Sequence, residues 1–193
     1  GKPSPNPPHP PHDPRVILLV QLDHLGDAII STGMLPALRK RYPHASIEVL
    51  AGAWNREVFE SAPEVDCVHV SHVNRFARGR LGRFLWIPAM LWWGLALRRR
   101  KVDLGIDVRG DFPVAVILRL CGARRRLGWD CGGGGFLLTD SADFVPHRPE
   151  VESRGALLAK LGIRASGTEA GRPRFQPGDE ARQEIARRLA AIH

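Results

Sequence analysis

The feature that most constrains the fold is an unbroken apolar run near the start of the chain. Residues Arg15–Leu22 read RVILLVQL and are rich in aliphatic and β-branched side chains. A strand that lacks alternation between apolar and polar residues is buried on both faces, as in the centre of a parallel sheet. The run therefore predicts a central strand that helices must cover on both sides.

The rest of the chain alternates between strand-like and helix-like segments. Further strands are expected at Ser46–Ala51, Asp66–Val70, Val102–Val108 and Arg125–Trp129. Helices are expected at Asp27–Arg41, Trp54–Ser61, from Pro88 or Ala89 to Lys101, and at Phe112–Cys121, Glu150–Leu161 and Gly178–Ile192. Such alternation is typical of right-handed βαβ units. The predicted fold class is α/β, with a Rossmann-like parallel sheet and helices on both of its faces.

Positive charge is concentrated in one part of the chain. The formal net charge is +8, and the stretch from Cys67 to Val102 contains eight Lys or Arg residues and no Asp or Glu. A local basic field attracts a polyanion, which can be nucleic acid, an anionic membrane or a phosphorylated substrate. The three cysteines are widely spaced and form no C-x-x-C pair. We therefore expect neither a metal site nor a disulfide framework, and a reducing cytoplasm suits the chain.

The turn after the first expected strand carries charged groups instead of a phosphate-binding loop. It reads Leu22-Asp23-His24-Leu25-Gly26-Asp27 and contains neither G-x-G-x-x-G nor G-x-x-x-x-G-K-[ST]. Ligands of parallel α/β sheets bind near such turns, at the carboxyl ends of the strands. Asp27 can be a helix N-cap, or it can be a general base that takes a proton from an attacking hydroxyl. Which of Asp23 and Asp27 would be the base stays open at this point.

Two blocks of the sequence resemble glycosyltransferase family 9, the ADP-heptose:lipopolysaccharide heptosyltransferases. The first block contains Gly26-Asp27, Lys40-Arg41-Tyr42-Pro43, Gly52-Ala53-Trp54 and Ala62-Pro63-Glu64-Val65-Asp66. The second contains Asp103, Asp107 and Gly110, then Gly122-Ala123 and Arg126-Leu127-Gly128-Trp129. The resemblance rests on the order and spacing of these motifs over about residues 15–145. One departure is Gly33, where many members have proline; it is expected to loosen the helix locally.

The resemblance implies a GT-B enzyme with two Rossmann-like domains that face a cleft. Family members invert the anomeric centre without a metal cofactor, and the Asp of the Gly-Asp pair, here Asp27, is their proposed base. The N-terminal domain binds the acceptor, and the C-terminal domain binds the nucleotide-diphosphate sugar. By this resemblance the chain is the acceptor-binding half. It is expected to have a disordered Pro-rich leader at residues 1–14, the acceptor domain at 15–175, and a helix at 176–193 leading toward a donor domain that is missing here. Because the chain begins with Gly, we expect it to be a piece of a longer protein, and this piece alone is expected to be inactive.

An acceptor that carries phosphate needs anion-binding groups around the cleft. The expected acceptor-binding residues are His24 and Gly26 beside the proposed base, Arg56 after the second strand, and Arg109 after the fourth. The alternative for each arginine is a surface position beside a local carboxylate. The expected partners are a lipid-linked phosphorylated glycan and, through the missing domain, a nucleotide-diphosphate sugar such as ADP-heptose.

The segment Phe84–Leu97 is a run of 14 residues without a polar side chain, flanked by basic residues. It is too short to span a bilayer but has the tryptophans and flanking cations of an interfacial membrane contact. The alternative is a core helix with solvated charged ends, in which Pro88 is the first helical residue. The expected membrane-contact residues are Arg83, Trp86, Trp92, Trp93 and Arg98. A lipid-linked acceptor would then place the protein in the cytoplasm, at the inner face of the bacterial inner membrane.

Other functions remain open from the sequence alone. A nucleotide-binding Rossmann module is the main alternative, although the glycine-rich loop is missing. A basic domain that binds membrane or nucleic acid without catalysis is another, although the basic stretch lacks exposed stacking aromatics on strands, and we expect no nucleic-acid partner. A transferase acting on a different surface glycan is the third.

Overall fold

The computed structural model describes residues 13–73, 80–163, 172–175 and 177–190. The polypeptide forms a six-stranded sheet in the order β3-β2-β1-β4-β5-β6, and every pair of neighbouring strands is parallel. The strands are β1 (Val16–Gln21), β2 (Ser46–Gly52), β3 (Cys67–Ser71), β4 (Leu104–Asp107), β5 (Arg125–Trp129) and β6 (Asp140–Ala142). This is the strand order of a Rossmann sheet, so the predicted fold class is confirmed.

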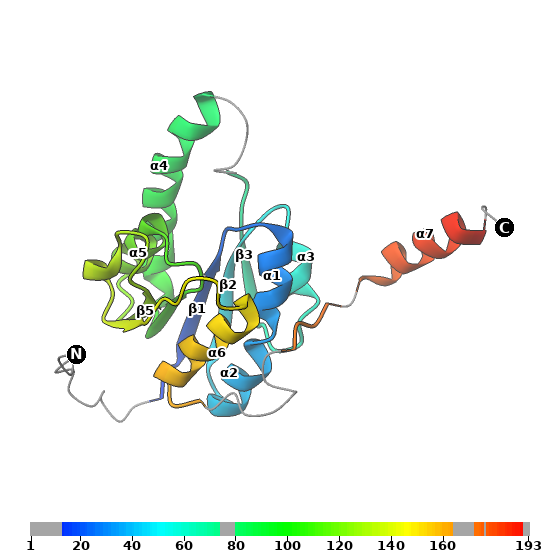
Figure 1. Cartoon of the computed structure of the whole chain (residues 1–193). Coiled ribbons are helices and arrows are strands. Elements are labelled where there is room, and N and C mark those ends of the chain that lie inside the picture. The colour runs from blue at the N-terminus through cyan, green and yellow to red at the C-terminus, as the bar shows by residue number, and fades with distance from the viewer. Residues whose placement is uncertain (1–12, 74–79, 164–171, 176, 191–193) are drawn as a thin grey trace.

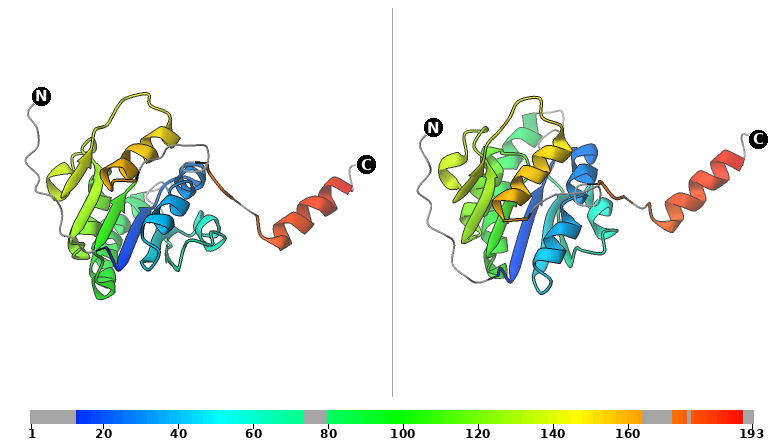
Figure 2. Two further views of the ribbon diagram at one scale, coloured as in Figure 1. Left: turned by 90° about the horizontal axis from the view of Figure 1, so that it is seen from below. Right: turned by 60° about the horizontal axis from the view of Figure 1, so that its bottom comes forward.

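Helices cover both faces of the sheet (Figures 1 and 2). One face carries α1 (Leu25–Thr32), α2 (Leu35–Arg41), α3 (Arg56–Glu60) and α6 (Glu150–Lys160). The other carries α4 (Arg80–Ala96), which continues into the 3-10 turn η1 (Leu97–Arg100), and α5 (Phe112–Leu120). A short 3-10 turn, η2 (Gly135–Leu137), follows β5, and α7 (Asp179–Ala190) stands away from the sheet (Figure 1).

The central strand separates two apolar cores. Ile17 and Leu19 point to the α1 side and Leu18 and Val20 to the α4 side, and all four are buried. Alternate residues of a strand point to opposite faces, so an apolar residue at every position fills both cores. The prediction of a doubly covered central strand from Arg15–Leu22 is confirmed.

Two of the helix predictions were wrong in their bounds. The expected helix Asp27–Arg41 is divided into α1 and α2, with Gly33 and Met34 between them. Glycine has poor helix propensity, which fits the local loosening expected at Gly33. Pro88 lies inside α4 instead of starting it, because the long apolar face of this helix packs on the sheet and outweighs the one backbone hydrogen bond that proline removes.

The strand β6 was missed by the sequence analysis. It has only three residues, Asp140–Ala142, without the β-branched residues typical of strands. It forms because it pairs in register with β5 and because Arg125 binds Asp140 with two hydrogen bonds of 3.1 Å. The domain boundaries proposed above stay predictions, and the leader up to residue 12 and the stretch 164–171 lie outside the described residues.

The motif Asp103…Asp107…Gly110 has a structural role at both ends of β4. The carboxylate of Asp103 accepts hydrogen bonds from the backbone N–H groups of Arg15 (2.9 Å) and Val16 (3.3 Å), which joins the beginnings of β1 and β4. The carboxylate of Asp107 accepts from the N–H groups of Arg109 (3.0 Å) and Gly110 (2.8 Å). Gly110 completes this turn with a φ of +86°.

Replacing Gly110 with alanine is expected to lower the free energy of unfolding by at least about 2 kcal/mol. A Cβ atom there would lie 2.8 Å from both the Cβ of Trp129 and the Sγ of Cys131, in addition to the strain of a positive φ. The matched control is Gly122→Ala, with a similar φ of +76° but no atom within 4 Å of the added carbon, so only the backbone strain of about 1 kcal/mol applies. Urea denaturation compares the two variants, and equal losses would contradict this explanation.

Candidate functional site

A cleft lies at the carboxyl ends of the strands. It encloses about 380 Å³. Its lining residues are Asp23, His24, Asp27, Val108, Arg109, Trp129, Phe144, Glu150, Ser153 and Arg154. They follow β1, β4 and β6, end β5, or belong to the N-terminal parts of α1 and α6. Between β1 and β4 the chain order of the sheet reverses, and the turns after these two strands therefore leave a crevice.

Asp23 is the buried centre of this crevice. Its side chain is only 6% exposed and forms an ion pair with Arg109. Its backbone carbonyl accepts hydrogen bonds from Trp54 Nε1 (2.7 Å) and Asn55 Nδ2 (2.9 Å). The turn after β1 is thus bound from two sides, by a cation after β4 and by the segment after β2. Trp54 therefore helps to position this turn.

Asp27 lies in the cleft but is not the N-cap of α1. The helix begins at Leu25, its N-cap is His24, and Asp27 is the third helical residue. The N-cap interpretation of Asp27 is therefore wrong, because the helix starts two residues earlier than expected. Among the described residues, none donates a hydrogen bond to the Asp27 carboxylate, and the side chain is half-buried.

The environment of Asp27 makes its carboxylate more basic. Burial raises the pKa of Asp27, and the neighbouring charges of Asp23 and Glu150 raise it further. The charges of Arg154 and Arg109 lower it and so offset part of this effect. The positive end of a helix dipole favours an ionised carboxylate and makes it a weaker base. Desolvation and the nearby carboxylates act in the opposite direction, and the resulting pKa lies above its ordinary value.

Arg109 is held between two carboxylates. Besides the ion pair with Asp23, its Nε lies 2.8 Å from Asp111 Oδ2. Its side chain is 37% exposed and lines the cleft. The turn that presents Arg109 is closed by the buried carboxyl group of Asp107. Burial raises the pKa of Asp107 to about 7, although the two backbone N–H groups that donate to it act to lower that pKa. Arg109 is thus fixed in direction before any ligand binds.

Only some of the predicted acceptor-binding residues line the cleft. His24 and Arg109 line the cleft together with Asp27. Gly26 lies exposed in the first turn of α1, with open space where a side chain would be. Arg56 is not among the lining residues; it is half exposed and faces Glu60 on its own helix at 3.7 Å. This is the local carboxylate partner that the alternative interpretation expected.

Arg154 is a site residue that the sequence analysis missed. It is 5% exposed, and its guanidinium donates to the Val108 carbonyl (2.7 Å) and to Ser31 Oγ (3.3 Å) and lies 3.0 Å from Glu150. It therefore joins α6 to α1 and to the end of β4 beneath the cleft. A signal existed in the sequence: Arg154 lies three, four and seven residues before Leu157, Leu158 and Leu161, on the apolar face of its helix.

No family model matches the chain. Lipopolysaccharide heptosyltransferase 3 of Escherichia coli is 26% identical over 143 residues, which are 72% of this chain and 40% of that protein. Lipopolysaccharide heptosyltransferase 2 of Escherichia coli K12 is 28% identical over 113 residues, 58% of this chain and 30% of that protein.

Solved structures agree with these sequence relatives. A glycosyl transferase of family 9 from Veillonella parvula superimposes with a TM-score of 0.76, at 20% identity, over 92% of this chain and 49% of that one. The ADP-heptose lipopolysaccharide heptosyltransferase II of E. coli gives a TM-score of 0.68 at 21% identity, over 90% and 50%. The chain is similar to the heptosyltransferases over most of its length. The expected resemblance is confirmed, and the chain spans about half the length of these structures.

The opposing charges around Asp27 predict opposite effects of two substitutions on its pKa. Arg154→Met removes a positive charge that lowers the pKa of Asp27, so that pKa is expected to rise. Asp23→Asn removes a negative charge that raises it, so that pKa is expected to fall. Carboxyl chemical shifts followed by NMR against pH measure both changes. Arg188→Met, which replaces an exposed arginine paired with Glu184 on α7, is the control and is expected to leave the pKa unchanged.

Proposed function

We propose that this chain is the acceptor-binding half of an inverting glycosyltransferase that moves a heptose from a nucleotide-diphosphate sugar to a lipopolysaccharide core. Asp27 is the general base, and the reaction uses no metal cofactor. The observation that carries the proposal is the position of Asp27: it lies in the cleft, has no hydrogen-bond donor among the described residues, and has a pKa raised by burial. The similarity to the heptosyltransferases supports the sugar and the class of acceptor.

The other cleft residues have supporting roles in this proposal. When an acceptor hydroxyl attacks the anomeric carbon, its proton passes to the Asp27 carboxylate while the diphosphate leaves with the bonding electron pair. Glu150 and Asp23 keep Asp27 basic, and Arg109 faces the charged groups of the acceptor from the opposite wall. Trp129, which is 3% exposed, and Phe144, whose ring meets it edge-on at 6.3 Å, form an apolar wall. The donor nucleotide is bound by a part of the protein outside these 193 residues.

Asp27→Asn in the complete protein is expected to lower the rate of sugar transfer by about 10²–10⁴-fold, because an amide cannot accept the proton. Asn keeps the size of the side chain, so the affinity for acceptor should change little. Product formation under saturating donor and acceptor is the measurement. Glu57→Gln removes an exposed carboxylate in the first turn of α3, outside the cleft, and is the matched control.

Two results would contradict this proposal. Asp27→Asn with full activity would exclude Asp27 as the base. Saturable binding of ADP to the 193-residue chain in calorimetry would show that the nucleotide binds to this domain, and the acceptor role of the cleft would have to be abandoned in favour of a nucleotide-binding module.

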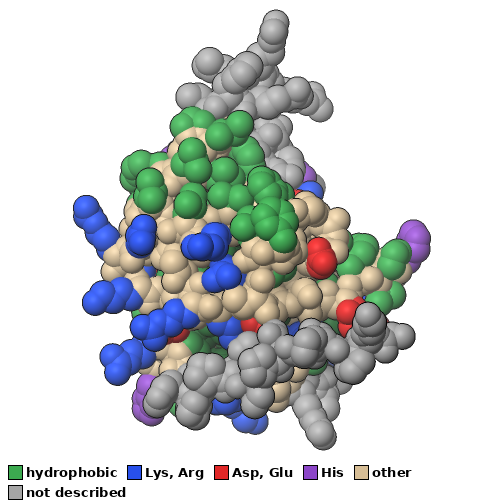
Figure 3. Space-filling model, turned by 90° about the vertical axis from the view of Figure 1, so that its left-hand side faces the viewer, with side chains coloured by type: hydrophobic (Ala, Val, Ile, Leu, Met, Phe, Trp, Pro, Cys, Tyr) green, Lys and Arg blue, Asp and Glu red, His purple; other side chains and the backbone are tan. Residues whose placement is uncertain are grey.

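A membrane contact through α4 is the second part of the proposal. Ile87, Leu91, Trp92 and Leu95 are 43–60% exposed and form an apolar patch on one side of this helix. Figure 3 shows hydrophobic side chains gathered on this face, with Lys and Arg side chains beside them. Arg98 and Arg99 are exposed at the end of the helix. In the part of the chain that the structure describes, no helix is long and apolar enough to cross a bilayer.

The predicted membrane residues divide into two groups. Trp92 and Arg98 are exposed, as a membrane contact requires. Trp86 and Trp93 are partly buried and pack against the core between α4 and the sheet, so they support the helix from beneath. The side chain of Arg83 lies outside the described residues. We propose that the exposed apolar side chains enter the headgroup region while the arginines meet anionic lipid, which would bring the cleft to a lipid-linked acceptor.

Replacing Trp92 and Leu95 together with serine is expected to weaken binding to vesicles of phosphatidylcholine and phosphatidylglycerol by at least about tenfold, because two exposed apolar side chains no longer leave water. Cosedimentation measures this binding. Val151→Ser, an exposed aliphatic position on α6 across the sheet, is the control. Unchanged binding by a folded Trp92→Ser/Leu95→Ser variant would contradict the contact without affecting the assignment of Asp27.

A further inference from the structure

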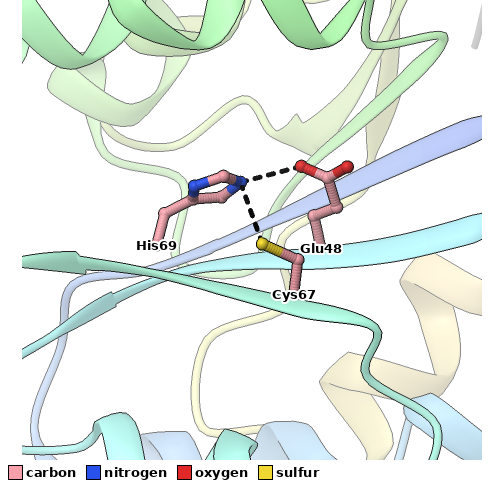
Figure 4. Close-up of side chains that lie close together, drawn as sticks. All are labelled: Glu48, Cys67 and His69. Carbon is pink, nitrogen blue, oxygen red and sulfur yellow. Dashed lines mark hydrogen bonds and ion pairs between the residues drawn. The ribbon is translucent and has the colours of Figure 1, made fainter.

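Three side chains with metal-binding atoms meet on the α4 side of the sheet, away from the cleft (Figure 4). Glu48 of β2 and Cys67 of β3 are paired directly across the two strands. His69 lies two residues after Cys67 and therefore on the same face. One ligand atom from each side chain lies within 4.8 Å of the other two. His69 Nε2 is central, 2.8 Å from Glu48 Oε2 and 3.8 Å from Cys67 Sγ.

The carboxylate of Glu48 is an unusual group to find at this place. Its side chain is 0% exposed within a parallel sheet, where a charge is costly unless it is paired. Arg100 from η1 donates from Nε to both carboxylate oxygens (3.1 and 3.0 Å) and from a terminal nitrogen to Oε1 (2.5 Å). Burial alone would raise the pKa of Glu48, but the hydrogen bonds with His69 and Arg100 outweigh it and hold the pKa at about 2. Arg100 thus pairs directly with this buried carboxylate.

Thiolate, imidazole and carboxylate groups are all ligands of zinc in proteins. Tetrahedral zinc with bonds of about 2.0–2.3 Å places its ligand atoms roughly 3.3–3.8 Å apart. The distance from His69 to Cys67 already falls in this range, and the distance from His69 to Glu48 has to open by only about 0.5 Å. Arg100 can stay on Oε1 as the outer partner that orients a ligating carboxylate, while Oε2 turns to the metal.

Charge balance also permits a zinc ion. Zn²⁺ displaces the proton of the Cys67 thiol, and the thiolate and the Glu48 carboxylate together neutralise the two positive charges, with His69 neutral. Arg100 is 47% exposed on its side chain, so its own charge stays solvated. The fourth coordination position can be taken by water, because His69 is 18% exposed.

We propose that Glu48, Cys67 and His69 form a zinc site that joins β2 to β3, with water as the fourth ligand. The site takes no part in the proposed sugar transfer, since none of its residues lines the cleft. It lies beneath α4: the rings of His69 and Trp93 meet edge-on with their centres 6.3 Å apart, and Arg100 follows the end of that helix. Zinc binding is therefore expected to stabilise the edge of the sheet together with the helix that carries the exposed apolar patch.

The test uses the 193-residue chain after removal of metals with a chelator. One equivalent of Zn²⁺ is expected to bind, measured by competition with a chromophoric chelator, and to raise the melting temperature. Co²⁺ is expected to give an absorption band from charge transfer between thiolate and metal. Cys67→Ser is expected to abolish this band and to weaken zinc binding at least about tenfold, and His69→Gln is expected to weaken it similarly.

Two variants test other metal-binding groups of the chain. His9 and His12 lie in the Pro-rich leader and could bind zinc by themselves, so His9→Gln/His12→Gln is expected to retain the equivalent of zinc. Cys131 is an exposed cysteine elsewhere, and Cys131→Ser is expected to keep the cobalt band. The proposal is overturned if the unmodified chain takes up no zinc or shows no thiolate band with cobalt. It is also overturned if folded Cys67→Ser binds zinc with unchanged affinity, or if the leader variant no longer binds zinc.

Discussion

The parallel pairing of β1 with both β2 and β4 is the constraint on which the rest of the molecule depends. In register, Leu19 lies beside Val49 on one side and beside Ile106 on the other. Because β1 is central, the chain after β1 turns toward one face and the chain after β4 toward the other. The two turns therefore diverge and leave the crevice. The ion pair between Asp23 and Arg109 then connects these turns across the crevice.

The cleft combines two opposing electrostatic effects around one carboxylate. The start of α1 favours a negative charge at Asp27, while burial and the neighbouring Asp23 disfavour it. The buried Arg154 limits how far the pKa rises and at the same time binds the Val108 carbonyl and Ser31. Arg154 is paired to Glu150 on its own helix and also binds α1 and the end of β4. It therefore couples the shape of the cleft to the basicity of Asp27.

The other face of the sheet contains a different arrangement of polar and apolar groups. There the buried Glu48 binds Arg100, which belongs to the basic cluster that ends α4. Arg100, from the long basic stretch, thus pairs with a buried carboxylate while its own side chain is 47% exposed. Arg98 and Arg99 beside it are also exposed. The apolar side chains of α4 and η1 divide between core and surface: Met90 and Leu97 fill the core, and Trp92 and Leu95 face outward. This basic, apolar segment therefore contributes side chains both to the core and to the exposed surface.

The sequence by itself determined the central strand, the order of strands and helices, and the turn that carries Asp23, His24 and Asp27, because apolar periodicity and local turn chemistry act over neighbouring residues. Tertiary structure alone decided what required distant residues to meet. Arg154 reaches Val108 across 46 positions, and Glu48 meets His69 across 21. Arg56 follows a strand as Arg109 does but lies outside the cleft. The start of α4 before Pro88 and the short β6 depended likewise on packing and pairing partners supplied by the completed sheet.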